Sequence, residues 1–221
     1  MNLNNVFDDF CESLKVRTED MAEDTIRYYW YSSMAKQDGD LNKYILEEQY
    51  GVSSTIMHPC ELDLHYKNNE SLLFEIKFHR KTSSTFAHTD AAGSIFGDLL
   101  RLLHHPTNPA RRLFLYVTDS EMDKYLSKGG NAYRNTLKEF YQLGIGVSKS
   151  LNFTTPPKTF LASAYKSFVL TKSYLTTPTI TIKLISKWDY IPKSCSSFAL
   201  NECHVRLYEV INGEKLEERA E

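Results

Sequence analysis

Residues 72–78 alternate apolar and polar side chains and form the clearest strand-like segment of the chain. Apolar residues occupy every second position from Leu72, while Glu75 and Lys77 lie between them. Because successive side chains of a strand point to opposite faces, Glu75 and Lys77 share one face and the apolar residues share the other. This pattern predicts a half-buried strand that carries a charged pair on one side.

The preceding segment, residues 60–66, shows the same alternation with two acids. Glu61 and Asp63 share one face, and the polar residues between the two segments predict the turn of a hairpin. Carboxylates and an ammonium group beside an apolar core are costly to bury unless they pair with each other or bind a cation. The hairpin therefore gathers Asp63, Glu75 and Lys77 into a candidate site for a hard metal ion.

The segments before and after the predicted hairpin show patterns typical of helices and of a buried strand. Apolar residues recur every three to four positions in residues 18–37 and 91–104, which predicts two helices. Residues 112–118 contain an unbroken apolar run, which is typical of a strand that is buried on both faces and has a parallel neighbour. Residues 44–50 are predicted to form a further strand, with a short helix over 41–49 as the alternative.

The predicted order of elements is helix, strand, strand, strand, helix, strand. A helix between the third and fourth strands requires a crossover, so we expect an α/β fold with a mixed central β-sheet flanked by helices. Beyond residue 119 we expect helices as far as residue 143, interrupted near Gly129, and later strands over 179–185 and 204–210.

Length and composition favour a single domain over residues 1–221. Hydrophobic residues make up 42% of the chain and charged residues 24%, which is ordinary for a globular protein. Apolar runs fall well short of the roughly 20 residues of a membrane helix, and the first residues lack the features of a secretory signal. The four cysteines, Cys11, Cys60, Cys195 and Cys203, are scattered, as expected for reduced thiols. We therefore expect a cytoplasmic location and no membrane association.

Charge is distributed unevenly along the chain, although the formal net charge is −2. Residues 1–70 carry a net charge of −8, residues 71–200 carry +9, and residues 201–221 carry −3. An acidic front and a basic middle fit a protein that meets a polyanion on one side, although a mixed solvated surface gives the same counts.

The element order and the charged residues together resemble the PD-(D/E)XK nuclease superfamily, the fold of many restriction endonucleases and of archaeal Holliday-junction resolvases. In that pattern an acid at the second core strand precedes a Glu-x-Lys motif in the third. Asp63 matches the first acid, and Glu75-Ile76-Lys77 matches the motif. Leu62 stands where the superfamily name has proline, a departure that many members share.

The resemblance covers about residues 19–118 and implies a restriction-endonuclease-like αβββαβ core. Residues 119–221 would then be a C-terminal addition, for which recognition of the DNA target is a natural role. Many members carry a further glutamate in the first helix. Its best match is Glu23, and the alternatives are Asp24, Glu47 and Glu48.

The resemblance also implies a Mg²⁺ ion, or Mn²⁺, held by Asp63, Glu75 and the backbone carbonyl of Ile76, with Glu23 as a further ligand. Such an ion would stabilise charge on the attacked phosphate and lower the pKa of a bound water. Lys77 would orient this water or neutralise the transition state, because neighbouring carboxylates oppose its use as a base. The alternative is that Glu75 and Lys77 form a simple exposed ion pair.

These features predict a metal-dependent DNA endonuclease of restriction, defence or repair type, with a homodimer as a reasonable arrangement. A non-catalytic nucleic-acid-binding or assembly module on the same fold is the rival interpretation, and an unrelated α/β fold is the third. Four residues are candidate phosphate contacts, namely His79, Arg80, Lys81 and Arg101. The first three are consecutive and form either a phosphate-binding cluster or an ordinary solvated turn.

Overall fold

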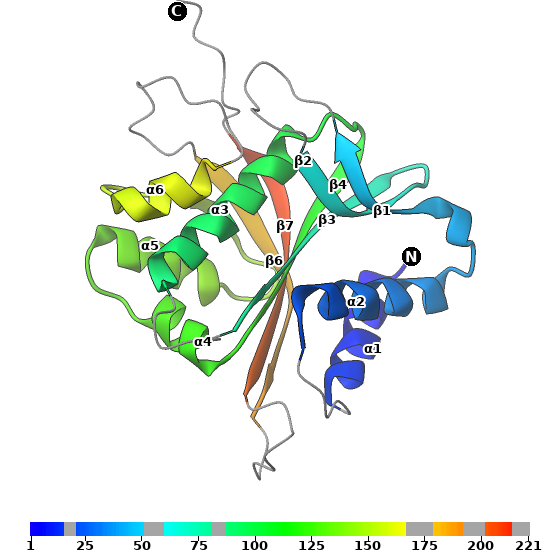
Figure 1. The fold of residues 1–221 in the computed structure, drawn as a ribbon, viewed down its shortest axis with the longest axis horizontal. Helices are drawn as coiled ribbons and strands as arrows, with labels where there is room; N and C mark the ends of the chain where they lie inside the picture. The colour runs from blue at the N-terminus through cyan, green and yellow to red at the C-terminus, as the bar shows by residue number, and fades with distance from the viewer. Residues whose placement is uncertain (16–20, 51–59, 81–86, 167–178, 192–201, 214–221) are drawn as a thin grey trace, which may run out of the picture.

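The computed structural model describes residues 1–15, 21–50, 60–80, 87–166, 179–191 and 202–213. Its helices are α1 (Leu3–Lys15), α2 (Glu23–Gln37), α3 (His88–His104), α4 (Ser120–Ser127), α5 (Ala132–Tyr141) and α6 (Lys158–Ala164), with a 3₁₀ turn η1 (Leu41–Lys43). Its strands are β1 (Tyr44–Tyr50), β2 (Cys60–Tyr66), β3 (Ser71–His79), β4 (Ala110–Thr118), β5 (Ser148–Leu151), β6 (Ile180–Tyr190) and β7 (Cys203–Gly213). The strands form one sheet with helices on both faces (Figure 1).

The sheet is mixed, with the strand order β1-β2-β3-β4-β7-β6-β5. β3 and β4 run parallel, and the other neighbouring strands are antiparallel. Helix α3 makes the crossover that a parallel pair requires. The predicted mixed α/β sheet flanked by helices is therefore confirmed, and α2 to β4 follow the predicted order of elements.

Two apolar layers hold the helices to the sheet. Helices α1 and α2 pack on one face, and α3, α4, α5 and α6 pack on the other (Figure 1). Phe74 and Ile76 of β3 join the first layer, whereas Leu73 joins the second, so the predicted alternation of β3 is confirmed. The Trp30 ring of α2 packs edge-on against Phe10 and Phe74, with centroids 5.4 and 5.6 Å apart.

Most predicted elements appear close to their expected positions. β2 has its predicted bounds, β3 is one residue longer at each end, and the segment after η1 is the strand rather than the alternative helix. The predicted helix over 18–37 begins at Glu23 in the structure, and residues 16–20 lie outside the described part of the chain. The sequence interpretation missed α1, β5 and α6.

Helix α3 lies unusually close to α6 because two of its glycines leave room for the α6 backbone. A Cβ atom on Gly93 would overlap the carbonyl group of Phe160, and one on Gly97 would lie 2.8 Å from the carbonyl oxygen of Ala164. These glycines fix the depth at which α3 sits between the sheet and α6.

We expect Gly93→Ala to lower the free energy of unfolding by about 1–3 kcal/mol, because α3 and α6 must move apart. The better helix propensity of alanine, up to about 1 kcal/mol, offsets only part of this cost. Gly39→Ala is the control, since no atom lies within 4 Å of its added Cβ. Urea unfolding measures both variants, and equal stabilities would contradict the close contact between α3 and α6.

Candidate functional site

The strands β2 and β3 separate at the centre of the candidate site. Their backbone pairing covers the three residue pairs next to the hairpin turn and ends there. Beyond this point the Asp63 carboxylate accepts a hydrogen bond from the backbone N–H of Ile76 at 2.5 Å. The Glu23 carboxylate, at the start of α2, accepts one from the backbone N–H of Phe78 at 3.2 Å. Two acids thus satisfy backbone donors that a neighbouring strand would otherwise satisfy.

The residues predicted from the motif lie together at this opening. Lys77 Nζ lies 3.1 Å from the Glu23 carboxylate, and Asp63 and Glu75 interact electrostatically. Asp63 is 5% exposed and Glu75 is 2% exposed. The N–H and C=O groups of one strand residue point to the same edge, so the Ile76 carbonyl also faces the opening.

Arg27 of α2 closes one side of the cluster, and the sequence interpretation missed it. Its guanidinium lies 2.7 Å from the Asp63 carboxylate and 3.4 Å from that of Glu23. It also lies 3.1 Å from Asp24 and 3.6 Å from Glu47. The four-residue spacing of Glu23 and Arg27 on a helix is a local signal for their contact, but the pairing with Asp63 depends on the tertiary fold.

Arg101 of α3 closes the other side. Its Nε and Nη2 atoms each lie 3.1 Å from a different carboxylate oxygen of Glu75, and Nη2 also lies 2.6 Å from Asp98. Arg101, which was predicted to contact phosphate, therefore pairs with two buried acids in this structure. One of these acids, Asp98, was not predicted as a site residue. Because Glu75 is buried and pairs with Arg101 while Lys77 pairs with Glu23, the alternative of an exposed Glu75–Lys77 pair is wrong.

Glu23 is the N-terminal acid that enters the cluster. The side chains of Asp24 and Glu47 are 75% and 62% exposed, and both pair with Arg27 on its outer side. Glu48 instead lies 2.5 Å from His65 Nδ1. Among these four candidates, Glu23 is the one that contacts Lys77 and the β3 backbone in the described structure.

Burial opposes ionisation of three acids in the cluster, Asp63, Glu75 and Asp98. It raises the pKa of Asp63 to about 7, although Arg27 and a backbone N–H act in the opposite direction. Burial also raises the pKa of Glu75 and that of Asp98, and Arg101 opposes both shifts.

Lys77 keeps its charge despite being largely covered. Burial alone would lower the pKa of its ammonium group, but the negative charges of Asp98 and Glu23 outweigh that effect and raise it. In their ionised forms, the four acids exceed the three cations of the cluster by one charge. The acids are Glu23, Asp63, Glu75 and Asp98, and the cations are Arg27, Lys77 and Arg101.

A pocket of about 140 Å³ opens beside Asp63. A water molecule needs about 10–15 Å³ by this measure, so the pocket has room for several waters or a hydrated ion. Tyr28, which is 65% exposed, and Glu47 contribute to its wall. Glu47 has a φ of 53°, an uncommon and costly backbone conformation for glutamate, and strained residues of this kind cluster at active sites and ligand-binding segments.

Glu23, Asp63 and Glu75 do not converge on one point in this structure, because arginines occupy two of them. Within the described residues, one set of three His, Cys, Asp or Glu side chains brings its ligand atoms within 4.8 Å of one another, and it lies elsewhere. That set is Asp123, Glu202 and His204. A divalent ion at the predicted site would therefore have to replace arginine contacts.

The first residue of the predicted phosphate cluster, His79 at the end of β3, is buried. His79 is 8% exposed, and its ring nitrogens lie 3.1 Å from the Tyr116 hydroxyl and 3.3 Å from the Ser94 hydroxyl. Burial lowers the pKa of its imidazole to about 3. The prediction is wrong for His79, which is an uncharged core residue. Arg80 is half-buried and stays a prediction, and Lys81 lies outside the described residues.

No family model matches the chain, and no curated protein or solved structure is significantly similar to it. The function of the site must therefore be inferred from its residues and their geometry.

We expect the free energy of unfolding of Asp63→Asn, measured relative to that of the wild type without metal, to rise as pH rises from about 4 to about 7. The pKa of Asp63 is raised on folding, so its favourable contribution is complete below its unfolded pKa of about 4 and is lost as pH approaches 7. The shift corresponds to about 4 kcal/mol at most.

Urea unfolding in a chelating buffer at several pH values measures this difference. Glu61→Gln is the matched control, because Glu61 is an exposed acid two residues away, and its difference from wild type should stay flat. A pH-independent difference for Asp63→Asn would contradict the raised pKa.

Proposed function

We propose that this chain is a metal-dependent endonuclease that hydrolyses phosphodiester bonds in DNA, of restriction, defence or repair type. The observation that best supports this proposal is the opening between β2 and β3, around which Asp63, Glu75, Lys77 and Glu23 lie in one cluster of charged side chains beside the Ile76 backbone. Burying so many charges together is unfavourable for stability, and clusters of strongly shifted pKa values are most common at functional sites.

The donor atoms at the opening suit a hard divalent ion. Mg²⁺ and Mn²⁺ prefer carboxylate and carbonyl oxygens, which Asp63, Glu75 and Ile76 would supply. A bound ion would stabilise negative charge on the phosphate and make a water molecule more acidic. When all four acids are ionised, the clustered side chains carry an excess of one negative charge, which would favour a cation at this position.

The remaining side chains of the cluster have roles of their own in this proposal. Lys77 would neutralise transition-state charge or orient the attacking water, and its raised pKa argues against action as a base. Arg27 and Arg101, released from their acids, would be free to contact phosphate oxygens. Tyr28 offers an exposed aromatic surface beside Asp63 on which a base could stack.

DNA as the partner is proposed from the family resemblance and from the basic middle of the chain. Part of that positive charge is balanced internally, since Arg111 pairs with Glu209 at 2.7 Å and Lys149 pairs with Glu139 at 3.0 Å. A homodimer would place two sites on a duplex. Among the described residues, no helix has both the length and the apolar character needed to cross a membrane.

A non-catalytic binding or assembly module on the same fold is the second candidate function. The observation that favours it is the pairing of both central acids with arginines, Asp63 with Arg27 and Glu75 with Arg101. In a cluster closed in this way the charges of the central acids are compensated without a metal ion. The two candidates differ in whether a divalent ion displaces those arginines.

We expect the purified protein to cut DNA in the presence of Mg²⁺ or Mn²⁺, and Asp63→Ala and Lys77→Ala to lower the rate by about 100-fold or more. Glu61→Ala should cut at the wild-type rate, because this acid is exposed on the same strand as Asp63. The assay uses plasmid, linear, single-stranded and branched substrates. Cleavage by Asp63→Ala and Lys77→Ala at the parental rate would rule out the proposed centre.

We expect Arg27→Met to tighten Mg²⁺ binding by about 10-fold, because it removes a positive charge that competes for Asp63. Lys36→Met is the control on the same helix, since Lys36 pairs with Asp9 at 2.9 Å, away from the cluster. Isothermal titration calorimetry measures both. Binding that is lost in Asp63→Asn supports the metal centre, whereas no Mg²⁺ binding by the parent or by Arg27→Met supports the non-catalytic module.

A further inference from the structure

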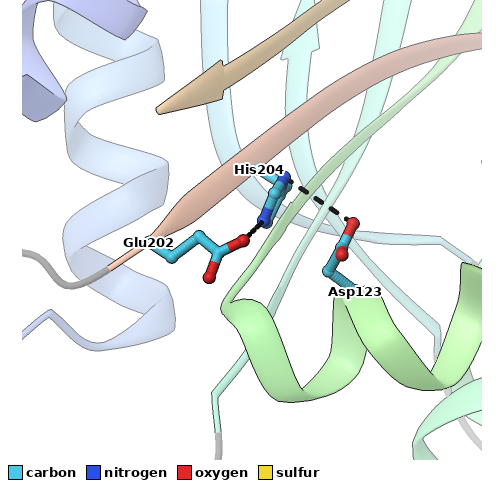
Figure 2. A group of neighbouring side chains, drawn as sticks. All are labelled: Asp123, Glu202 and His204. Carbon is cyan, nitrogen blue, oxygen red and sulfur yellow. Dashed lines mark hydrogen bonds and ion pairs between the residues drawn. The ribbon is translucent and has the colours of Figure 1, made fainter. Parts of the chain in front are cut away.

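A second group of ionisable side chains surrounds His204 near the start of β7. The imidazole is 5% exposed. Its Nδ1 atom lies 2.8 Å from an Asp189 carboxylate oxygen and 3.6 Å from one of Asp123, and its Nε2 atom lies 3.1 Å from one of Glu202. Figure 2 shows Asp123 of α4 and Glu202 reaching the ring from different sides. Three segments of the chain, α4, the end of β6 and the start of β7, therefore meet at one histidine.

The charges around this histidine are not balanced by permanent cations. Three carboxylates face it, and Arg206, 2.7 Å from Asp189, is the cation paired with one of them. Both ring nitrogens face carboxylate oxygens, so a cation is favoured at this position, either a proton on the ring or a metal ion bound to one of its nitrogens. A divalent ion would replace one proton and add a further positive charge to an acid-rich site.

A buried hydroxyl beside Asp123 adds support. The Tyr141 hydroxyl is buried and has no well-formed hydrogen bond within the described part of the chain. Asp123 is close enough to act on it as a hydrogen-bonding neighbour, Arg206 acts on it electrostatically, and its ring lies 4.8 Å from the Arg206 guanidinium. A buried hydroxyl left unpaired is costly. A water molecule held as a further ligand of an ion on Asp123 would give it a partner.

We propose that Asp123, Glu202 and His204 form a metal site for a divalent transition ion such as Zn²⁺ or Mn²⁺. One imidazole and two carboxylates are donors that these ions accept readily, whereas Mg²⁺ prefers oxygen alone. The ligand atoms already lie within 4.8 Å of one another. Zinc ligands at about 2.0–2.2 Å lie closer together than this, so the side chains must close around the ion.

The two acids have the freedom to make that movement. The side chain of Glu202 is 30% exposed and that of Asp123 is 23% exposed, whereas that of His204 is 6% exposed. The site therefore combines one fixed ligand with two adjustable ones that are open to solvent. It is independent of the Asp63 cluster, because the two share no residue.

The test titrates the whole protein with Zn²⁺, Mn²⁺ and Mg²⁺ by calorimetry and follows Co²⁺ as a spectroscopic substitute. We expect one equivalent of Zn²⁺ at this site and a visible Co²⁺ band typical of an imidazole and carboxylate environment. Glu202→Gln, on a partly exposed side chain, and His204→Gln should each weaken Zn²⁺ binding at least 10-fold. Circular dichroism confirms that both variants fold.

Asp63→Asn is the matched control, because it alters the other cluster and should leave Zn²⁺ binding unchanged. Retention of wild-type affinity in Glu202→Gln would overturn the proposal, as would Zn²⁺ binding that is lost only in Asp63→Asn. Absence of DNA cleavage by the wild-type protein, with Zn²⁺ binding at this site retained, would count against the nuclease proposal alone, so the two failures can be told apart.

Discussion

The parallel pairing of β3 with β4 determines where the candidate site can form. Nine consecutive residue pairs join the two strands, from Ser71↔Ala110 to His79↔Thr118. Parallel neighbours need a crossover, and α3 supplies it. The crossover carries Asp98 and Arg101 over the face of β3 that presents Glu75. The other edge of β3 pairs with β2. Where this pairing ends, side-chain carboxylates, rather than backbone carbonyls, accept hydrogen bonds from the backbone N–H groups of β3.

Charge compensation is the second constraint, and it works both for and against a metal centre. Breaking a buried ion pair by removing one partner costs about 3–5 kcal/mol, so Arg27 and Arg101 are strong determinants of the stability of this cluster. The same arginines occupy the oxygens of Asp63 and Glu75 that an ion would need. In the proposed function, metal binding at this opening would therefore exchange one cation for another. The affinity for the ion would depend on the difference in free energy between the arginine-paired and the ion-bound arrangements.

The sequence predicts the hairpin and β4 well because their signals are local. Alternation identifies β2 and β3, and an unbroken apolar run identifies β4 as a strand buried on both faces. Asp63, Glu75 and Lys77 follow from alternation and from the family motif. Helix α1 was missed although its buried residues recur at three- and four-residue steps, so that signal was available. The partners of Arg27 and Arg101 across the sheet were not predictable, because only the tertiary fold brings them together. The burial of His79 was not predictable for the same reason. Nor was the contact between Asp123 and His204, which lie 81 positions apart in the chain.

The two charged groups share no side chain, and the paired strands β3, β4 and β7 connect them. His79 at the end of β3 pairs with Thr118 of β4, and Thr118 pairs with His204 of β7. The His79 carbonyl also accepts hydrogen bonds from the Thr118 hydroxyl at 3.1 Å and from the backbone N–H of Asp119 at 3.2 Å. Adjacent strands lie about 4.8 Å apart, so His204 is about two strand spacings from the end of β3 that follows Lys77. An ion at His204 would fasten β7 to α4, and through these pairings it would also limit the movement of the β3 segment on which Lys77 depends.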